Sequence, residues 1–89
     1  MSTDPTLPNA PLDATFSALL MSIASSAAMS LGLAPQPHSQ EVTKDKALAR
    51  FNIDLLLVLK EKSIGNLTTD EQRLLEALLS DLQMKYISL

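Results

Sequence analysis

The chain contains a long uncharged stretch, from Ala14 to Gln40, in which there is no Asp, Glu, Lys or Arg. Its centre, TFSALLMSIASSAAMSLGL over residues 15–33, is apolar enough to raise the question of a membrane span. No basic residue precedes it, so the positive flank of a signal peptide or an anchor is missing, and five serines lower its hydropathy. We therefore expect a buried helix here in preference to a membrane span.

Length and composition limit how such a chain can be stabilised. At 89 residues it forms one small domain, which buries only about 60% of the surface that its unfolded form exposes. Small domains usually add disulfides, a structural metal or oligomerisation to a marginal core, and this chain has 0 Cys and 1 His. Oligomerisation remains, so we expect an obligate homo-oligomer without a stable monomer. We expect no cofactor and no metal. A chain without cysteine needs no oxidising compartment, and we expect a cytoplasmic location.

The charge balance argues against nucleic acid as a partner. The chain has 7 basic and 10 acidic residues, a net charge of −3 and 3% aromatic residues, so both a basic footprint and stacking rings are lacking. Lys44, Lys46 and Arg50 form a short basic patch, but acidic residues are interleaved with them. That pattern favours a solvated face of ion pairs. Weak nucleic-acid binding through the patch stays open as an alternative.

Start and stop signals predict the first helix. Residues 1–12 contain three prolines and are expected to form a disordered N-terminal arm, whereas residues 13–88 form a single helical domain. We expect Asp13 to be the N-cap of the first helix, whose last residue is Leu31. Gly32 then supplies a left-handed position after the helix.

The second helix is predicted to begin at residue 42 or 43, after a loop with two prolines at residues 34–40. It runs to Ile64, with Gly65 directly after it. Two lysines lie in its last turns, where a positive charge suits the helix dipole.

The third helix has the clearest start signal. Thr68 and Glu71 form a capping box, and the helix continues to about Tyr86 or Ile87. There is no strand-like alternation, so the predicted fold class is all-α. We expect a three-helix small domain in which the second and third helices form an antiparallel hairpin, the first packs across it, and copies associate into an oligomeric helical bundle.

The predicted helices carry more apolar surface than one chain can hide. The third helix has a single apolar face, made of Leu74, Leu75, Leu78, Leu79, Leu82 and Tyr86. The second has one stripe of Leu48, Phe51, Leu55, Val58 and Leu59, and a nearly opposite stripe of Ile53, Leu57 and Ile64, with Leu56 beside it. The large-residue face of the first helix consists of Phe16, Leu19, Leu20, Ile23, Ala27 and Leu31. Its far side has a row of small residues spaced by four, Ala18, Ser22, Ser26 and Ser30, with Met29 adjoining.

Small residues spaced by four allow two helix backbones to approach closely, although a row of serines can also be an exposed surface. The absence of charge on that side favours contact. We therefore predict a two-fold homodimer, the simplest such oligomer, held through the first helix and the second stripe of the second helix. The predicted interface residues are Ala18, Ser22, Ser26, Met29, Ile53, Leu57 and Ile64.

No residues form a recognisable catalytic or metal-binding pattern. There is no nucleophile paired with a base, and the acidic residues fall on polar faces or at helix starts. His38 lies in the proline loop without a second ligand at metal spacing, so we interpret it as a solvated side chain. We predict no enzyme activity, no catalytic residue and no cofactor site.

The turn SIGNLT, residues 63–68, has a structural interpretation. Gly65 takes the left-handed position, Asn66 tolerates unusual dihedral angles, Leu67 packs back on the core and Thr68 caps the next helix. The alternative is that Ser63 and Asn66 present polar groups to a partner.

The segment LLLVLKEKSIGNLTTDEQRLLEALLSDLQMKYI, residues 55–87, resembles the bacterial family known as domain of unknown function 1844. Members show a leucine-rich helix that ends in a Lys-Thr-x-Gly-Asn-Leu-Thr type of turn, an acidic helix start and a terminal helix that closes near a tyrosine. Here Ser63 stands where a threonine is common. The likeness extends over residues 13–88 through Phe16, Leu31–Gly32, Pro35, Pro37 and Ile53–Asp54–Leu55. It implies a small, compact, helical bacterial protein and adds no mechanism.

Function is thus predicted only as a class. We expect a structural or protein-interaction module that binds a second copy of itself and could also dock another protein's helix. The alternatives are peripheral membrane or lipid association through the first helix, and the weak nucleic-acid binding described above.

Overall fold

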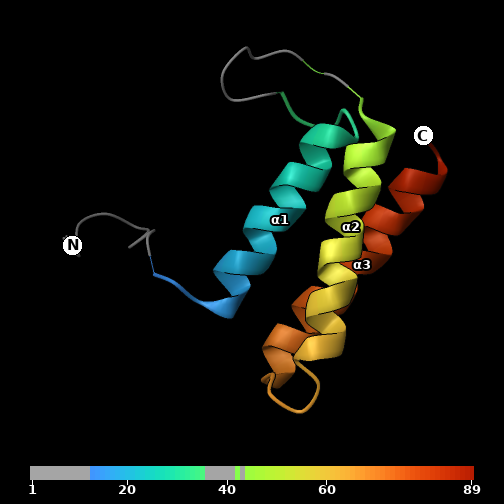
Figure 1. Ribbon diagram of the computed structural model, residues 1–89. Helices are drawn as coiled ribbons and strands as arrows, with labels where there is room; N and C mark the ends of the chain where they lie inside the picture. The colour runs from blue at the N-terminus through green and yellow to red at the C-terminus, as the bar shows by residue number, and fades with distance from the viewer. Residues whose placement is uncertain (1–12, 36–41, 43) are drawn as a thin grey trace.

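Three α-helices make up most of the chain in a computed structural model that describes residues 13–35, 42 and 44–89. They are α1 (Phe16–Ser30), α2 (Lys46–Lys62) and α3 (Thr69–Ile87), shown in Figure 1. The described residues include no strand, and Leu31 and Lys44 form one isolated antiparallel bridge. The prediction of an all-α, three-helix fold is confirmed. The N-terminal arm and the loop with His38 lie outside the described residues.

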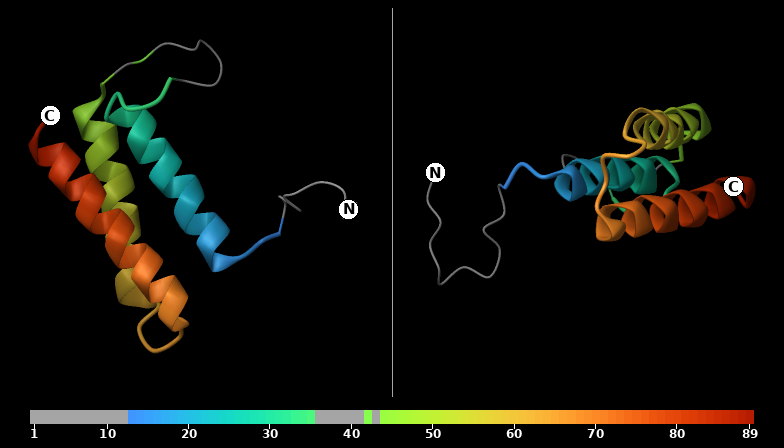
Figure 2. Two further views of the ribbon diagram at one scale, coloured as in Figure 1. Left: turned by 180° about the vertical axis from the view of Figure 1, so that it is seen from behind. Right: turned by 90° about the horizontal axis from the view of Figure 1, so that it is seen from below.

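The helices alternate in direction along the chain. α1 and α3 point the same way and α2 runs opposite to both (Figure 1). α2 lies in front of α1 and α3 in that view, and the view from below in Figure 2 also places α2 on one side of the other two. α1 and α2 make the most extensive contact, and α3 contacts both. One side of α2 is therefore turned away from the rest of the chain.

α1 begins at Phe16, three residues after the predicted cap. Thr15 is the N-cap, with extended backbone dihedrals, and its Oγ1 accepts a hydrogen bond from the amide of Ala18 at 3.0 Å. The prediction of Asp13 as N-cap is wrong, and Asp13 is an exposed residue before the helix. A threonine is a poor residue inside a helix and a good one at its start, so the later residue is the favoured cap.

The end of α1 follows the prediction closely. Leu31 is the C-cap and Gly32 has a φ of 78°. The amide of Gly32 donates to the Met29 carbonyl and that of Leu33 to the Ala28 carbonyl, at 3.1 and 2.9 Å. This pair of bonds is a Schellman motif, which satisfies carbonyls that the helix end leaves without partners.

α2 is shorter at both ends than predicted. Asp45 is its N-cap, and the carboxylate accepts a hydrogen bond from the Leu48 amide at 3.0 Å. Before it, the backbone of Lys44 pairs with Leu31, and the Asp45 amide donates to the Ser30 carbonyl at 2.7 Å. A helical start at residue 42 would remove these contacts with the end of α1. At the other end the C-cap is Ser63, so the prediction that α2 reaches Ile64 is also wrong.

α3 has the start and end that its sequence indicates. The Thr68 hydroxyl accepts a hydrogen bond from the Glu71 amide at 3.1 Å, and the Glu71 carboxylate accepts one from the Thr68 amide at 2.8 Å. The capping box is therefore complete, and Asp70 and Glu71 place negative charge in the first turn. The helix ends at Ile87.

A single core joins the three helices. Its buried apolar residues are Leu20, Ala24, Ala27, Leu31, Ala49, Ile53, Leu56, Leu75, Leu79 and Leu82. The predicted apolar face of α3 is confirmed, because all its members are either in the core or packed against it. On α1 the prediction of Leu19 as a core-facing residue is wrong, since Leu19 is exposed.

The side of α2 that faces the core lies between the two predicted stripes. Ala49, Asn52, Ile53 and Leu56 are buried. Asn52 is satisfied locally, because its side-chain amide donates to the Leu48 carbonyl at 3.0 Å. The first stripe, which has the larger residues, is the one turned outward.

Replacing Thr68 by alanine tests the capping box. The substitution removes the hydroxyl that accepts the Glu71 amide, so we expect a loss of about 1 kcal/mol in the free energy of unfolding, measured by urea denaturation. Thr69→Ala is the matched control, because Thr69 is an exposed residue inside the helix. An equal loss in both variants would contradict a specific capping role for Thr68.

Replacing Leu56 by alanine tests the core. Leu56 is fully buried, so we expect a loss of about 2–5 kcal/mol, a large fraction of the stability of a small domain. The adjacent Leu57 is 40% exposed, and Leu57→Ala should cost clearly less. Thermal unfolding followed by circular dichroism compares the two, and similar midpoints would contradict this assignment of the core.

Candidate interaction surface

The turn between α2 and α3 is held by contacts within the turn and with the end of α2. The Ser63 hydroxyl donates to the Leu59 carbonyl at 2.6 Å, and the Asn66 amide donates to the Ser63 carbonyl at 2.9 Å. Gly65 has a φ of 81°, as predicted, and a side chain there would meet no atom within 4 Å. Glycine is thus favoured by its backbone conformation and not by lack of space. Leu67 packs against the core, so the turn residues have structural roles that account for them.

The row of small residues on α1 does not form one straight face. Ala18 and Ser22 are exposed, Ser26 and the adjoining Met29 are half-buried, and Ser30 is buried in the core. A helix turns by about 400° over four residues, so such a row winds about 40° at each step. The row therefore passes from the outer side of α1 to the inside of the chain. The Ser30 hydroxyl is satisfied there by the Ser26 carbonyl at 2.8 Å.

The predicted interface residues of α2 differ in their burial. Ile53 is 3% exposed and belongs to the core of its own chain. Leu57 lies on the surface, and Ile64 is in the turn after the end of α2, with 76% of its surface exposed. Ile53 and Leu57 line one hollow between α2 and α3, and Ile64 is not part of that lining.

A different apolar surface runs along the outer side of α2. Leu48, Phe51 and Val58 are 44%, 56% and 49% exposed, and Leu55 between them is half-buried. We call these four residues the α2 seam. Their spacing of three, four and three residues places them in a line along the helix and matches the repeat of a coiled-coil contact. All four residues belong to the first apolar stripe of α2, and their periodicity alone does not indicate that this stripe is the exposed one.

Two of the three residues in the basic patch contact other side chains of the same chain. Arg50 forms an ion pair with Asp54 at 3.2 Å, and the Lys46 ammonium lies 5.5 Å from the centre of the Tyr86 ring. The backbone of Lys44 pairs with Leu31, and Lys44 is exposed. The neighbouring Tyr86 and Asp54 side chains raise the pKa of Arg50 above its ordinary value. Acidic and aromatic partners thus accompany two of the three cations.

A hollow lies beside this patch, between α2 and α3. It has a volume of about 340 Å³ and an open shape. Its lining residues are Arg50, Ile53, Asp54, Leu57, Gln83, Tyr86 and Ile87. The one ion pair in this lining is the exposed Arg50–Asp54 pair, so no catalytic set of buried polar groups converges here.

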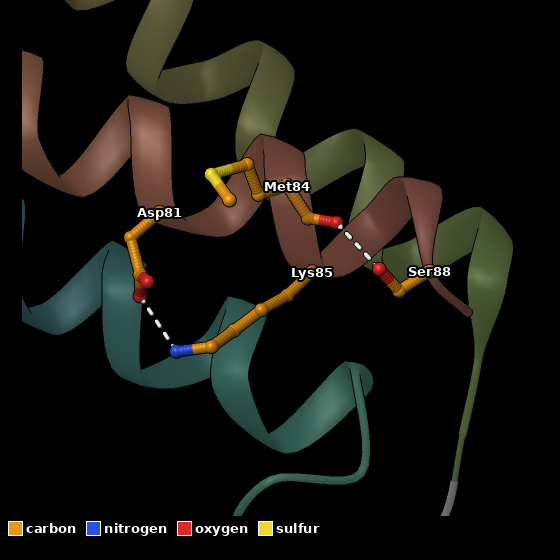
Figure 3. A network of polar contacts seen from close by, with 4 residues as sticks. All are labelled: Asp81, Met84, Lys85 and Ser88. Carbon is orange, nitrogen blue, oxygen red and sulfur yellow. Dashed lines mark hydrogen bonds and ion pairs between the residues drawn. The ribbon is translucent and has the colours of Figure 1, made fainter.

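The remaining polar contacts are local to single helices. Figure 3 shows the Lys85–Asp81 ion pair, 2.8 Å long and one helical turn apart, and the Ser88 hydroxyl donating to the Met84 carbonyl. Exposed pairs of this kind contribute little. Within the described part of the chain there is no group of three or more acidic or histidine side chains placed to hold a metal ion. None of the helices formed by the described residues is both long and apolar enough to cross a membrane.

Comparison with known proteins identifies a family without a known activity. The family described as domain of unknown function (DUF1844) matches residues 13–88. No curated protein and no solved structure matches the chain. The match covers all three helices and the α2 seam, and the resemblance inferred from the turn is confirmed. The chain belongs to the DUF1844 family.

Proposed function

We propose that this protein is a non-enzymatic structural or interaction module of the cytoplasm that acts as a homo-oligomer, most simply a two-fold dimer. The observation that carries the proposal is the α2 seam. One exposed apolar residue on the surface of a protein needs no explanation. Here four large apolar residues lie in line on the outer side of one helix, and a continuous apolar surface of this kind does need one. Such a line has the pattern of a helix-to-helix contact.

The energetics favour covering this surface. Complete burial of a leucine, valine or phenylalanine side chain contributes about 1.5–3 kcal/mol, so side chains that are about half exposed leave about 1 kcal/mol each unrealised. A self-complementary contact buries the seam on both copies at once. The free energy gained by this burial must exceed the cost of association, which is about 4 kcal/mol or more. For a contact made through one helix, that cost is a large fraction of the gain. We therefore propose a dimer that depends on protein concentration.

The core formed within one chain affects the expected state of the monomer. Among the described residues, each chain encloses ten buried apolar ones without help from a partner. In place of the obligate oligomer expected from the sequence, we therefore propose that dissociation leaves a helical monomer of reduced stability. The antiparallel pairing of α2 and α3, with α1 packed on both, is the unit that we expect to persist in it.

Sedimentation of the whole chain tests the proposal. We expect the average mass to rise across the micromolar range toward twice the 9.6 kDa of one chain, and circular dichroism to remain helical throughout. A constant mass of one chain over that range, with the helical signal intact, would overturn the homo-oligomer. A mass that rises only when a foreign helical peptide is added would instead identify another protein's helix as the partner.

A further inference from the structure

We infer that the α2 seams of two copies pack against each other in antiparallel orientation, so that Leu48 of one copy faces Val58 of the other and Phe51 faces Leu55. This inference rests on the proposed homo-oligomer and specifies its interface. It also moves the interface away from the row of small residues on α1.

The shape of the seam suits a contact with a second helix. Its members occupy the two alternating apolar positions of a heptad pattern, three and then four residues apart, over a helix of 17 residues. Lys62 continues the same line at the end of α2, and α2 begins only two residues before Leu48, so the apolar part is limited at both ends. A second copy of the seam has the same length and the same boundaries. No other described helix offers an exposed line of this kind, because the exposed apolar residues of α1 and α3 are scattered.

Burial within the chain also favours the seam over the row on α1. An interface through the outer row of α1 would use Ala18 and Ser22, since Ser30 is already inside the core. These two small side chains have little apolar area to bury. The α2 seam offers large side chains that are about half exposed, with far more apolar area. The seam therefore gains more from a second copy than the α1 row does.

The helix dipoles favour one orientation of the pair. Antiparallel helices place opposite ends of their dipoles side by side, whereas parallel helices align them. The charged side chains of α2 do not add to this preference, because Lys46 and Arg50 lie near its start and Lys60 and Lys62 near its end. The antiparallel orientation therefore follows from the dipoles.

A charge-introducing variant at the centre of the seam tests the surface. We expect Phe51→Glu to raise the dissociation constant of the dimer by about 30-fold or more, the loss typical of a central anchor residue. The matched control is Leu57→Lys, an exposed α2 residue outside the seam, and Ser22→Leu probes the outer side of α1. Both should leave the dissociation constant within a few-fold of that of the unchanged chain. If either of these two variants loses the dimer while Phe51→Glu remains dimeric, the seam is not the interface. That result would support the interface predicted from α1 and Leu57.

Cysteine cross-linking tests the orientation and does not depend on a variant that could unfold. The chain has 0 Cys, so each introduced thiol is the only one. A mixture of the Leu48→Cys and Val58→Cys chains should form a mixed disulfide dimer on mild oxidation, and neither chain alone should do so efficiently. Ser80→Cys, at an exposed site on α3, is the control for random collision.

The outcomes separate the two proposals. Efficient disulfides of Leu48→Cys with itself and of Val58→Cys with itself would overturn the antiparallel orientation in favour of a parallel pair. Cross-linking at the level of the Ser80→Cys control, in a chain that sedimentation shows to be dimeric, would overturn the seam and leave the homo-oligomer standing. A monomeric unchanged chain in sedimentation would overturn both.

Discussion

The close contact between α1 and α2 is the interaction on which the rest of the fold depends. Ala24 and Ala27 on α1 and Ala49 on α2 are all buried, and these two helices share the most extensive contact in the chain. Small side chains allow helix axes to approach to about 8 Å, the short end of the usual range. At one end of the pair, the Asp45 amide donates to the Ser30 carbonyl. That bond satisfies a carbonyl at the end of α1 and places the start of α2 directly beside it.

This contact also determines which side of α2 faces water. When Ala49 faces α1, the turn of about 100° per residue brings Ile53 and Leu56 to the core and carries Leu48, Phe51 and Val58 outward. The sequence pattern alone favours the side with the largest apolar residues as the core side, because such residues dominate a helical wheel. An alanine and an asparagine contribute little to such a pattern, although both Ala49 and Asn52 lie in the core. Ala49 and Asn52 are thus part of the side of α2 that faces the core, and the periodicity of large apolar residues does not identify them.

Features that depend on a few neighbouring residues were predictable from the sequence. The capping box, the left-handed Gly32 and Gly65, and the apolar face of α3 follow from local chemistry and were predicted correctly. The starts of α1 and α2 were not, since each has several acceptable capping residues and tertiary contacts choose between them. For α2 the choice of Asp45 is favoured by the bridge between Lys44 and Leu31, which joins residues that are distant in the sequence. The candidate surface was missed for the same reason, because it is defined by what the other helices leave uncovered.

The outer sides of α2 and α3 differ in composition. Between Asp70 and Gln83, the exposed side chains of α3 are polar except for Ala77, and the large exposed apolar residues Met84 and Ile87 lie in its last turn. Both helices pack on the same core and have similar lengths, so their outer sides face the same solvent. A monomer would have no use for large apolar residues on the outer side of α2, where polar ones would be equally compatible with the core. Three of the four seam residues are nonetheless close to half exposed or more, in a line with coiled-coil spacing. The folding of a single chain does not account for that line, and this is why we propose that a second copy covers it.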